Sequence, residues 1–429
     1  MNRVRAAAGA WFRASRALLG SARFTQALTE VSLVAALCMH ALRGVIGWPG
    51  ALAVLAALVL LAALSIAAQP ERLEWRGVLP LSLLALVGLM ALSVVWSQYT
   101  WATLGGAVYA IAFAALGLYV ALLRDTIQVV RSIGNALRAI LTTSLLLEIL
   151  SGVIIDTPLR FLGIQGLIAD GGPIQGLAGT RNYLAFLGGL AVVSFWIEYR
   201  TRSVPRGLTV FSLAIAALTL VFARSPVAAL ALAAVLVAGL ALVGLRRMDA
   251  GARRTAQAVL LVSAVAALAI AWVFRGRLIR VVDAGIDVTV RTSVWADLEP
   301  LIEQNPVSGW GWVGAWPTEV FPFVIVRDAF GNRQDSALNA YLDVTLQLGI
   351  AGLLVLITAL GLALVRAWLV ASERRSTVHV WPALTIVLLA VTSVTESYLL
   401  TEGGLMLFVI AAVTAAQSRS WRGKLRPTA

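Results

Sequence analysis

Long apolar segments, most of them about twenty residues, alternate with short polar connections along the whole chain. An α-helix rises about 1.5 Å per residue, so such a segment crosses the ~30 Å of hydrocarbon in a bilayer. Strands of a membrane barrel would instead alternate polar and apolar positions over about ten residues. The pattern therefore predicts an all-α integral membrane protein with about twelve transmembrane helices. The expected spans are residues 28–47, 50–68, 77–97, 101–123, 132–155, 182–198, 206–223, 226–245, 256–274, 350–370, 378–395 and 402–417.

The composition agrees with membrane insertion and excludes several kinds of site. Hydrophobic residues make up 60% of the 429 positions and charged residues 13%, which are values of a membrane protein rather than of a soluble one. Cys38 is the only cysteine, so no internal disulfide and no cysteine metal cluster can form. His40 and His379 are the only histidines and lie far from the long loops, so we expect no metal site and no cofactor.

The formal net charge of +13 comes from Lys and Arg residues that gather in alternate connections. Basic residues in short loops mark the cytoplasmic side of a multi-pass protein. With an even number of spans, this distribution predicts that both termini are cytoplasmic. The charge therefore reports membrane topology, and we expect membrane lipids as neighbours and no nucleic acid as a partner.

Two connections on the opposite, extracytoplasmic side are long, namely residues 156–181 and 275–349. Long connections in a tightly connected bundle are usually functional. We expect transmembrane helices in residues 1–274, a large loop containing short helices in residues 275–349, and further helices with a cytoplasmic tail in residues 350–429. Residues 337–348 are the candidate for a short helix at the membrane surface.

Arginines on the extracytoplasmic side run against the usual insertion preference. A guanidinium stays charged and donates two parallel hydrogen bonds, so a cluster of such groups suits a diphosphate or a sugar phosphate. Arg224 stands between two spans with almost no loop to keep it in water, and Arg181 opens a span, where helix N–H groups also favour phosphate. Pairing with loop carboxylates, contact with lipid headgroups or simple anchoring is the alternative. The predicted extracytoplasmic set is Arg43, Arg160, Arg181, Arg224, Arg275, Arg277, Arg280, Arg291, Arg327 and Arg333.

Four tryptophans, at positions 295, 310, 312 and 316, fall in the large loop. Tryptophan combines an apolar ring with one N–H donor, so it suits both the membrane interface and the face of a sugar. We favour the interface anchor, with sugar stacking as the alternative.

Short motifs follow one another in the second half of the chain. They run from Arg291-Thr292-Ser293-Val294-Trp295 through Pro306-Val307-Ser308-Gly309-Trp310-Gly311 and Asn339-Ala340-Tyr341-Leu342-Asp343 to Leu348-Gly349-Ile350-Ala351-Gly352-Leu353, with Arg224-Ser225 upstream. In this order, and with this topology, the chain resembles the O-antigen ligase and polymerase superfamily.

The resemblance implies a GT-C-like glycosyltransferase that needs no metal. It implies inverting transfer of a glycan from undecaprenyl diphosphate-linked O antigen at the periplasmic face of the bacterial inner membrane. The single dominant loop is similar to that of the ligase, whose acceptor is lipid A–core oligosaccharide. Arg181, Arg224 and Arg291 are then expected at the diphosphate or sugar phosphate, and the acceptor near Asn339 and Tyr341. Packing of the short helix is the alternative role of Tyr341.

The chain departs from the family pattern at one position. The resemblance implies a histidine base two residues before Asn339, and this position is Ala337. Alanine cannot accept a proton, so we expect a chain that is deficient in transfer but keeps its substrate site, through an introduced substitution or natural divergence. Asp335 is the alternative base, although an ordinary carboxylate is weakly basic at neutral pH.

Two other functions stay open on the sequence. An O-antigen polymerase, from the same superfamily, would lengthen the carrier-linked chain. A lipid-linked oligosaccharide transporter would move the carrier across the membrane without forming a glycosidic bond. The sequence shows no convincing pair of interrupted helices in corresponding halves, which weakens the transporter alternative.

Overall fold

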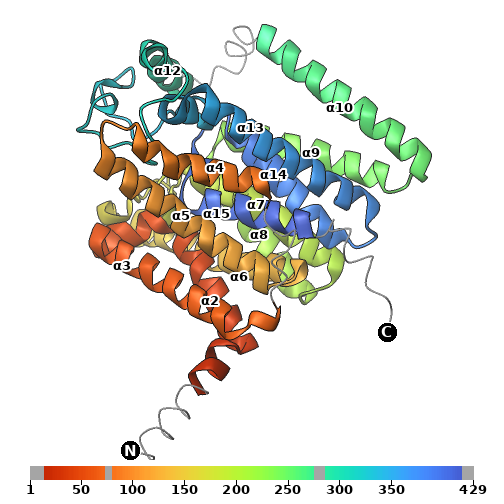
Figure 1. Cartoon of the computed structure of the whole chain (residues 1–429). Helices are drawn as coiled ribbons and strands as arrows, with labels where there is room; N and C mark the ends of the chain where they lie inside the picture. Colours follow the sequence, from red (N-terminus) through yellow and green to blue (C-terminus); the bar gives the residue numbers. More distant parts are fainter. Residues whose placement is uncertain (1–13, 73–79, 275–285, 418–429) are drawn as a thin grey trace, which may run out of the picture.

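The computed structural model describes residues 14–72, 80–274 and 286–417, which form a helical bundle with a cap at one end (Figure 1). Within these residues, strand-type pairing is limited to two isolated bridges, so the all-α prediction is confirmed. The cap contains α12 (Ile286–Gln304). The bundle contains α2 (Ala22–Leu37), α3 (Met39–Ala68), α4 (Leu81–Leu92), α5 (Thr100–Leu123), α6 (Thr126–Ile149), α7 (Arg181–Thr201), α8 (Arg206–Ala223), α9 (Pro226–Leu245), α10 (Ala250–Val273), α13 (Ala340–Glu373), α14 (Val380–Thr392) and α15 (Glu402–Gln417).

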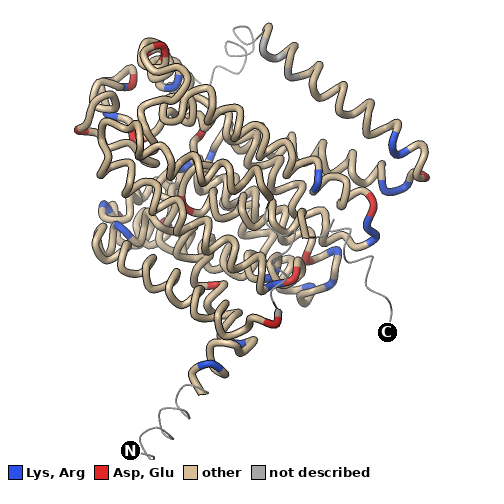
Figure 2. Tube along the Cα trace, viewed as in Figure 1, with Lys and Arg blue, Asp and Glu red and all other residues tan. Residues whose placement is uncertain are grey.

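Helix length and composition identify a multi-pass membrane protein. Charged residues lie mainly towards the ends of the bundle, and its middle carries few of them (Figure 2). The full set of about twelve spans stays a prediction. Six helices of the described residues are long and apolar enough to cross a membrane: Met39–Ala68, Thr100–Leu123, Thr126–Ile154, Arg206–Ala223, Pro226–Leu245 and Ala340–Glu373.

Three helices, α8, α9 and α15, have the bounds predicted from the sequence. The turn between α8 and α9 is tight because Arg224 takes a left-handed conformation with φ of 46°. The Ser225 hydroxyl caps α9 by accepting a hydrogen bond from the Ala228 N–H at 3.2 Å. Pro226 is the first residue of α9, where a missing N–H costs no helical hydrogen bond. These local preferences reverse the chain directly after α8.

The boundary predicted between the first two spans, 28–47 and 50–68, falls at a kink inside α3. A further break, at Cys38, divides the first predicted span between α2 and α3. Gly47 has φ of 69°, which glycine adopts without strain, and Pro49 then stands at the start of the second helical segment, where its ring is tolerated. Glycine and proline therefore interrupt the helix here, and α3 consists of two helical segments joined at Gly47.

The cap packs around an apolar core of its own. Val294 and Leu298 of α12 are buried together with Trp310, Trp316 and Phe323 from the segment that follows. Burying such large side chains stabilises the cap by removing apolar surface from water. Trp310 and Trp316 therefore hold the cap together, and the interpretation of these two as interface anchors is wrong.

α13 begins in the cap and continues into the bundle across a kink. Its first turns match the short helix predicted at residues 337–348, and Gly349 (φ 66°) separates them from the long apolar part. A Cβ on Gly349 would lie 2.1 Å from the Val307 carbonyl oxygen, so only glycine fits. The Gln347 side chain accepts a hydrogen bond from the Val313 N–H at 2.7 Å. The cap is thereby fixed to the end of the bundle.

α10 stands away from the other helices along most of its length (Figure 1). Apolar side chains such as Val259 and Val265 are more than half exposed. A helix that presents apolar residues to its surroundings is typical of contact with lipid. Three predicted extracytoplasmic arginines and both chain termini lie outside the described residues; the arginines are Arg275, Arg277 and Arg280.

Candidate functional site

Glu396 lies at the centre of a polar network where the cap joins the bundle. Its Oε1 accepts hydrogen bonds from Arg291 Nη2 of α12 at 2.6 Å and from Asn182 Nδ2 of α7 at 2.7 Å. Arg291 also donates its Nε–H to the Thr395 carbonyl oxygen at 3.0 Å. The ion pair therefore connects α12 and the start of α7 with the segment 393–401, which links α14 to α15.

The turn between α8 and α9 joins this network through Ser225. The Ser225 hydroxyl donates to Asn182 Oδ1 at 2.8 Å. The Asn182 side chain thus donates to Glu396 and accepts from Ser225, so it bridges these two residues. We refer to Glu396, Arg291, Asn182 and Ser225 as the Glu396 network. Its members come from four separate segments, so it fixes these segments relative to one another.

Aromatic and charged groups border the Glu396 network. Thr180 Oγ1 caps α7 by accepting from the Tyr183 N–H at 3.2 Å, and it lies 3.3 Å from the Tyr398 hydroxyl. The ring centroids of Tyr183 and Tyr398 are 4.7 Å apart. Arg43 and Glu402 form a second, partly exposed ion pair whose charges act on Tyr183. This end of the bundle therefore combines aromatic faces with charges of both signs.

Burial determines how the Glu396 carboxyl group titrates. Removal from water raises its pKa, while the charge of Arg291 and the hydrogen bonds from Asn182, Arg291 and Tyr398 oppose that rise. In a low dielectric the two charges attract each other strongly, but either one left alone is costly. The network is therefore stable only while both charges are present.

Arg291, one of the three arginines predicted at the phosphate, lies inside the protein. Its residue surface is 8% exposed, and Glu396 compensates its charge. A buried and paired guanidinium orients the groups around it and is less open to a ligand than an exposed one. The structure therefore gives Arg291 a contact that sequence reasoning did not anticipate.

Arg181 and Arg224 lie at the rim of the Glu396 network. Arg181 is the first residue of α7, is half-buried and directly precedes Asn182. Arg224 is exposed and directly precedes Ser225. Its guanidinium lies beside Gly171, where an added Cβ would be 2.9 Å from Nη2. The network thus sets the backbone position of both arginines.

Part of this site falls in a region that a known family shares. Residues 211–357 match the O-antigen ligase family model. The match confirms the resemblance carried by the motifs, and it spans roughly a third of the chain, from α8 into the apolar part of α13. It includes Arg224 and Arg291, whereas Arg181 and Glu396 lie outside it. No curated protein matches the chain.

In the O-antigen ligase region, Asn339 and Tyr341 make contacts within the protein. Asn339 Oδ1 caps α13 by accepting from the N–H groups of Tyr341 at 2.9 Å and Leu342 at 3.1 Å. The Tyr341 hydroxyl donates to the Ala390 carbonyl oxygen of α14 at 3.0 Å. Both side chains therefore fix the start of α13 against its neighbours.

Ala337, at the position expected for the base, is fully buried in the cap core. Its N–H donates to Asp343 Oδ2 at 3.3 Å, and its carbonyl oxygen accepts from Trp295 Nε1 at 2.9 Å. Because Ala337 is fully buried, the imidazole of a histidine at this position would have to displace neighbouring side chains of the cap core. The backbone of Ala337, rather than its side chain, carries the contacts seen here.

Sequence reasoning missed the acidic centre of this site. Glu396 lies in Thr395-Glu396-Ser397, directly after a predicted span, and a carboxylate so close to hydrocarbon is expensive unless it is paired. This cost was the signal in the sequence that Glu396 has a buried partner. Asn182 and Ser225 carried a weaker one, since each adjoins an arginine that the sequence did single out.

No group of three potential metal ligands from His, Cys, Asp and Glu comes together in the described part of the chain. A hollow of about 430 Å³ lies between residues 16–20 and the end of α3, lined by residues such as Arg16, Gln69 and Glu71. None of its lining residues belongs to the Glu396 network, so we assign it no part in the site.

Proposed function

We propose that the chain is a glycosyltransferase that ligates undecaprenyl diphosphate-linked O antigen to lipid A–core oligosaccharide. The reaction takes place at the periplasmic face of the bacterial inner membrane, with both termini cytoplasmic. The O-antigen ligase match and the membrane helices support this assignment. The observation that carries it is the Glu396 network, because it joins the segments that bear Arg181, Arg224 and Arg291.

Arg181 and Arg224 bind the diphosphate of the carrier in this proposal. Inverting transfer breaks the bond between the first sugar carbon and the diphosphate oxygen while the acceptor oxygen attacks from the opposite side. Negative charge therefore develops on the leaving diphosphate. Guanidinium groups held in place beforehand stabilise that charge without reorganising solvent, and the N–H groups at the start of α7 add to the positive field. This chemistry uses no metal ion and no cofactor.

Arg291 contributes to diphosphate binding mainly through Glu396. Its charge favours the ionised form of Glu396, and Glu396 in turn orients Asn182 and, through it, Ser225. A misplacement of about 1 Å at a reacting group can cost two orders of magnitude in rate. Arg291 therefore sets the geometry in which the other two arginines meet the donor.

Residues 275–349 form the periplasmic loop in this proposal, between the helices of residues 1–274 and those of residues 350–429. The lipid A–core acceptor approaches beneath this loop, near Asn339 and Tyr341. Because these two side chains hold the start of α13, they shape the acceptor site through that helix end.

Two positions are candidates for the base that takes the acceptor proton. Ala337 stands where the resemblance implies histidine, and a chain deficient in transfer for this reason stays a prediction. Asp335 lies two residues earlier and is exposed, so it is accessible to an acceptor without repacking. Loss of transfer in Asp335→Asn assigns the base to Asp335, whereas a gain of transfer in Ala337→His assigns it to position 337.

Reconstitution with both defined substrates tests the proposed function. The purified chain and its Ala337→His variant are placed in separate liposomes with lipid-linked O antigen and lipid A–core, and the mass of each lipid is followed. A lipid A–core product heavier by one whole glycan supports the ligase. Lengthening of the carrier-linked glycan identifies a polymerase, and carrier translocation without a new glycosidic bond identifies a transporter.

A further inference from the structure

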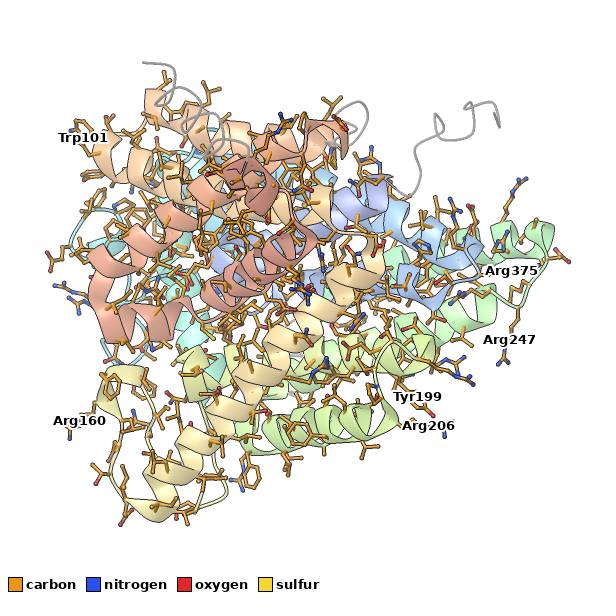
Figure 3. All side chains as sticks on the ribbon, turned by 90° about the horizontal axis from the view of Figure 1, so that it is seen from below. Trp101, Arg160, Tyr199, Arg206, Arg247 and Arg375 are labelled. Carbon is orange, nitrogen blue, oxygen red and sulfur yellow. The ribbon has the colours of Figure 1, made fainter. Side chains whose placement is uncertain are left out.

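Arginines from several helix ends gather at the end of the bundle opposite the cap. Arg206 begins α8, Arg247 follows α9 and Arg375 follows α13. Figure 3 shows these three at one end of the molecule and Arg160 at the other. Arg200, in the last turn of α7, belongs to the same end. This face therefore presents a concentrated positive charge.

Arg246 ties the helix ends of this face together. Its Nη2 donates to the Arg374 carbonyl oxygen at 2.8 Å and also to that of Arg375, at the end of α13. Gln257 of α10 donates to the Ser372 hydroxyl at 2.8 Å. The ends of α9, α10 and α13 are thus held side by side, so their cations share one surface and are not spread over separate loops.

Within the described residues, Arg246, Arg247 and Arg375 form no ion pair with a carboxylate. Three acids lie at this end of the bundle: Glu198 is paired with Arg138, Asp249 accepts a hydrogen bond from the Ala252 N–H at 2.8 Å, and Glu373 ends α13. Burial, together with the charge of Arg200, lowers the pKa of the Arg246 guanidinium. Cations held this close repel one another unless an anion approaches them.

The surroundings of these arginines favour an anion attached to a lipid over a free one. Leu240, in the last turns of α9, is 62% exposed just ahead of Arg246 and Arg247. Tyr199, 53% exposed, lies at the same end (Figure 3). An exposed apolar helix surface ending in guanidinium groups matches an acyl chain that ends in a phosphate.

We propose that this arginine-rich end binds the headgroup of an anionic phospholipid. Arg247 and Arg375 contact the phosphate directly, and Arg246 sets the distance between them by holding the end of α13 against the end of α9. The site is separate from the Glu396 network and does not depend on the function proposed for that network. Its ligand class is a phosphodiester on a diacyl anchor, such as phosphatidylglycerol.

The test compares matched variants of the full chain in nanodiscs made with phosphatidylcholine and a graded fraction of phosphatidylglycerol. The Arg247→Gln/Arg375→Gln variant removes two cations at this end. The Arg160→Gln/Arg333→Gln variant removes two exposed cations from the cap end. Lipids that remain bound after extraction are counted by native mass spectrometry, and melting temperature in pure phosphatidylcholine checks that each variant is folded.

The first variant is expected to retain phosphatidylglycerol with an affinity lower by roughly 10- to 30-fold, since each arginine near an anionic surface contributes about a factor of five. The cap-end variant is expected to behave as wild type. Equal loss in both variants, or no loss in the first, overturns the proposal. Displacement of the lipid by millimolar inorganic phosphate overturns the assignment to a lipid-attached anion. If the double variant melts early in phosphatidylcholine, Arg375→Gln alone replaces it, because the Arg375 side chain makes no hydrogen bond to any residue that the structure describes.

Discussion

Replacing Glu396 with glutamine removes the negative charge that faces the buried guanidinium of Arg291. The side chains are 6% and 9% exposed, so water cannot replace the lost partner. Breaking a buried ion pair on one side typically costs 3–5 kcal/mol, because the remaining charge stays buried without compensation. Arg291 keeps its hydrogen bond to the Thr395 carbonyl oxygen, which places the expected loss near the lower limit. We expect Glu396→Gln to lower the free energy of unfolding by about 3 kcal/mol, roughly a hundredfold in the unfolding equilibrium.

The same substitution is expected to weaken donor binding, because Asn182 and Ser225 lose the carboxylate that orients them. Binding is measured as the dissociation constant for undecaprenyl diphosphate in detergent, at a temperature where the variant is fully folded. The matched control is Glu198→Gln, which breaks the buried pair of Glu198 and Arg138 between α6 and α7, away from the Glu396 network. We expect similar destabilisation in this control and unchanged donor affinity.

This comparison separates a local effect from general damage to the fold. Weakened binding in Glu396→Gln alone supports the positioning role of the network. If Glu396→Gln is folded and binds the donor as tightly as wild type, the reasoning from the network to the diphosphate is refuted. If both variants lose binding equally, the loss follows from stability and the network has no special role.

Other substitutions test separate parts of the account. Arg181→Ala and Arg224→Ala should each weaken the binding of the donor by about 1.5–3 kcal/mol, which is the usual contribution of a hydrogen bond to a charged group. Binding is measured by titration with the carrier, and Arg160→Ala is the control variant. Ala337→His should lower the melting temperature, with a cost of about 1–3 kcal/mol for overpacking, and a gain of transfer in this variant assigns the base to position 337. Burial raises the pKa of Glu396, so acidification should protonate Glu396 at a higher pH than it protonates an exposed glutamate. Donor affinity should fall as the pH decreases through this pKa. The Glu396→Gln variant should not show this pH-dependent loss of affinity.

Much of the bundle could be predicted from the sequence because apolar length and helix caps are local properties. The bounds of α8 and α9 followed from the pattern itself, and the Ser225 and Pro226 start signals agree with them. Gly47 and Pro49 marked the interruption inside α3 in the same local way. The break at Cys38 was missed because no glycine or proline stands there to mark it.

The site was predictable only in part, because its decisive contacts join residues far apart in the chain. Arg181 and Arg224 could be singled out because each is a charged residue close to a predicted membrane span. The structure places both at the rim of the Glu396 network. The partner of Arg291 could not be inferred, since Glu396 lies 105 positions away. At Ala337 the family motif identified the position but not its surroundings. The residue is fully buried, and this burial decides which groups a side chain at position 337 can reach.

The affinity of the chain for undecaprenyl diphosphate tests the central claim most directly. It is measured for wild type, for the combined Arg181→Gln/Arg224→Gln/Arg291→Gln variant, and for Arg160→Gln as the control. The account predicts loss of carrier binding in the combined variant and wild-type binding in the control, with all three chains folded. Wild-type carrier affinity in a folded combined variant would contradict it.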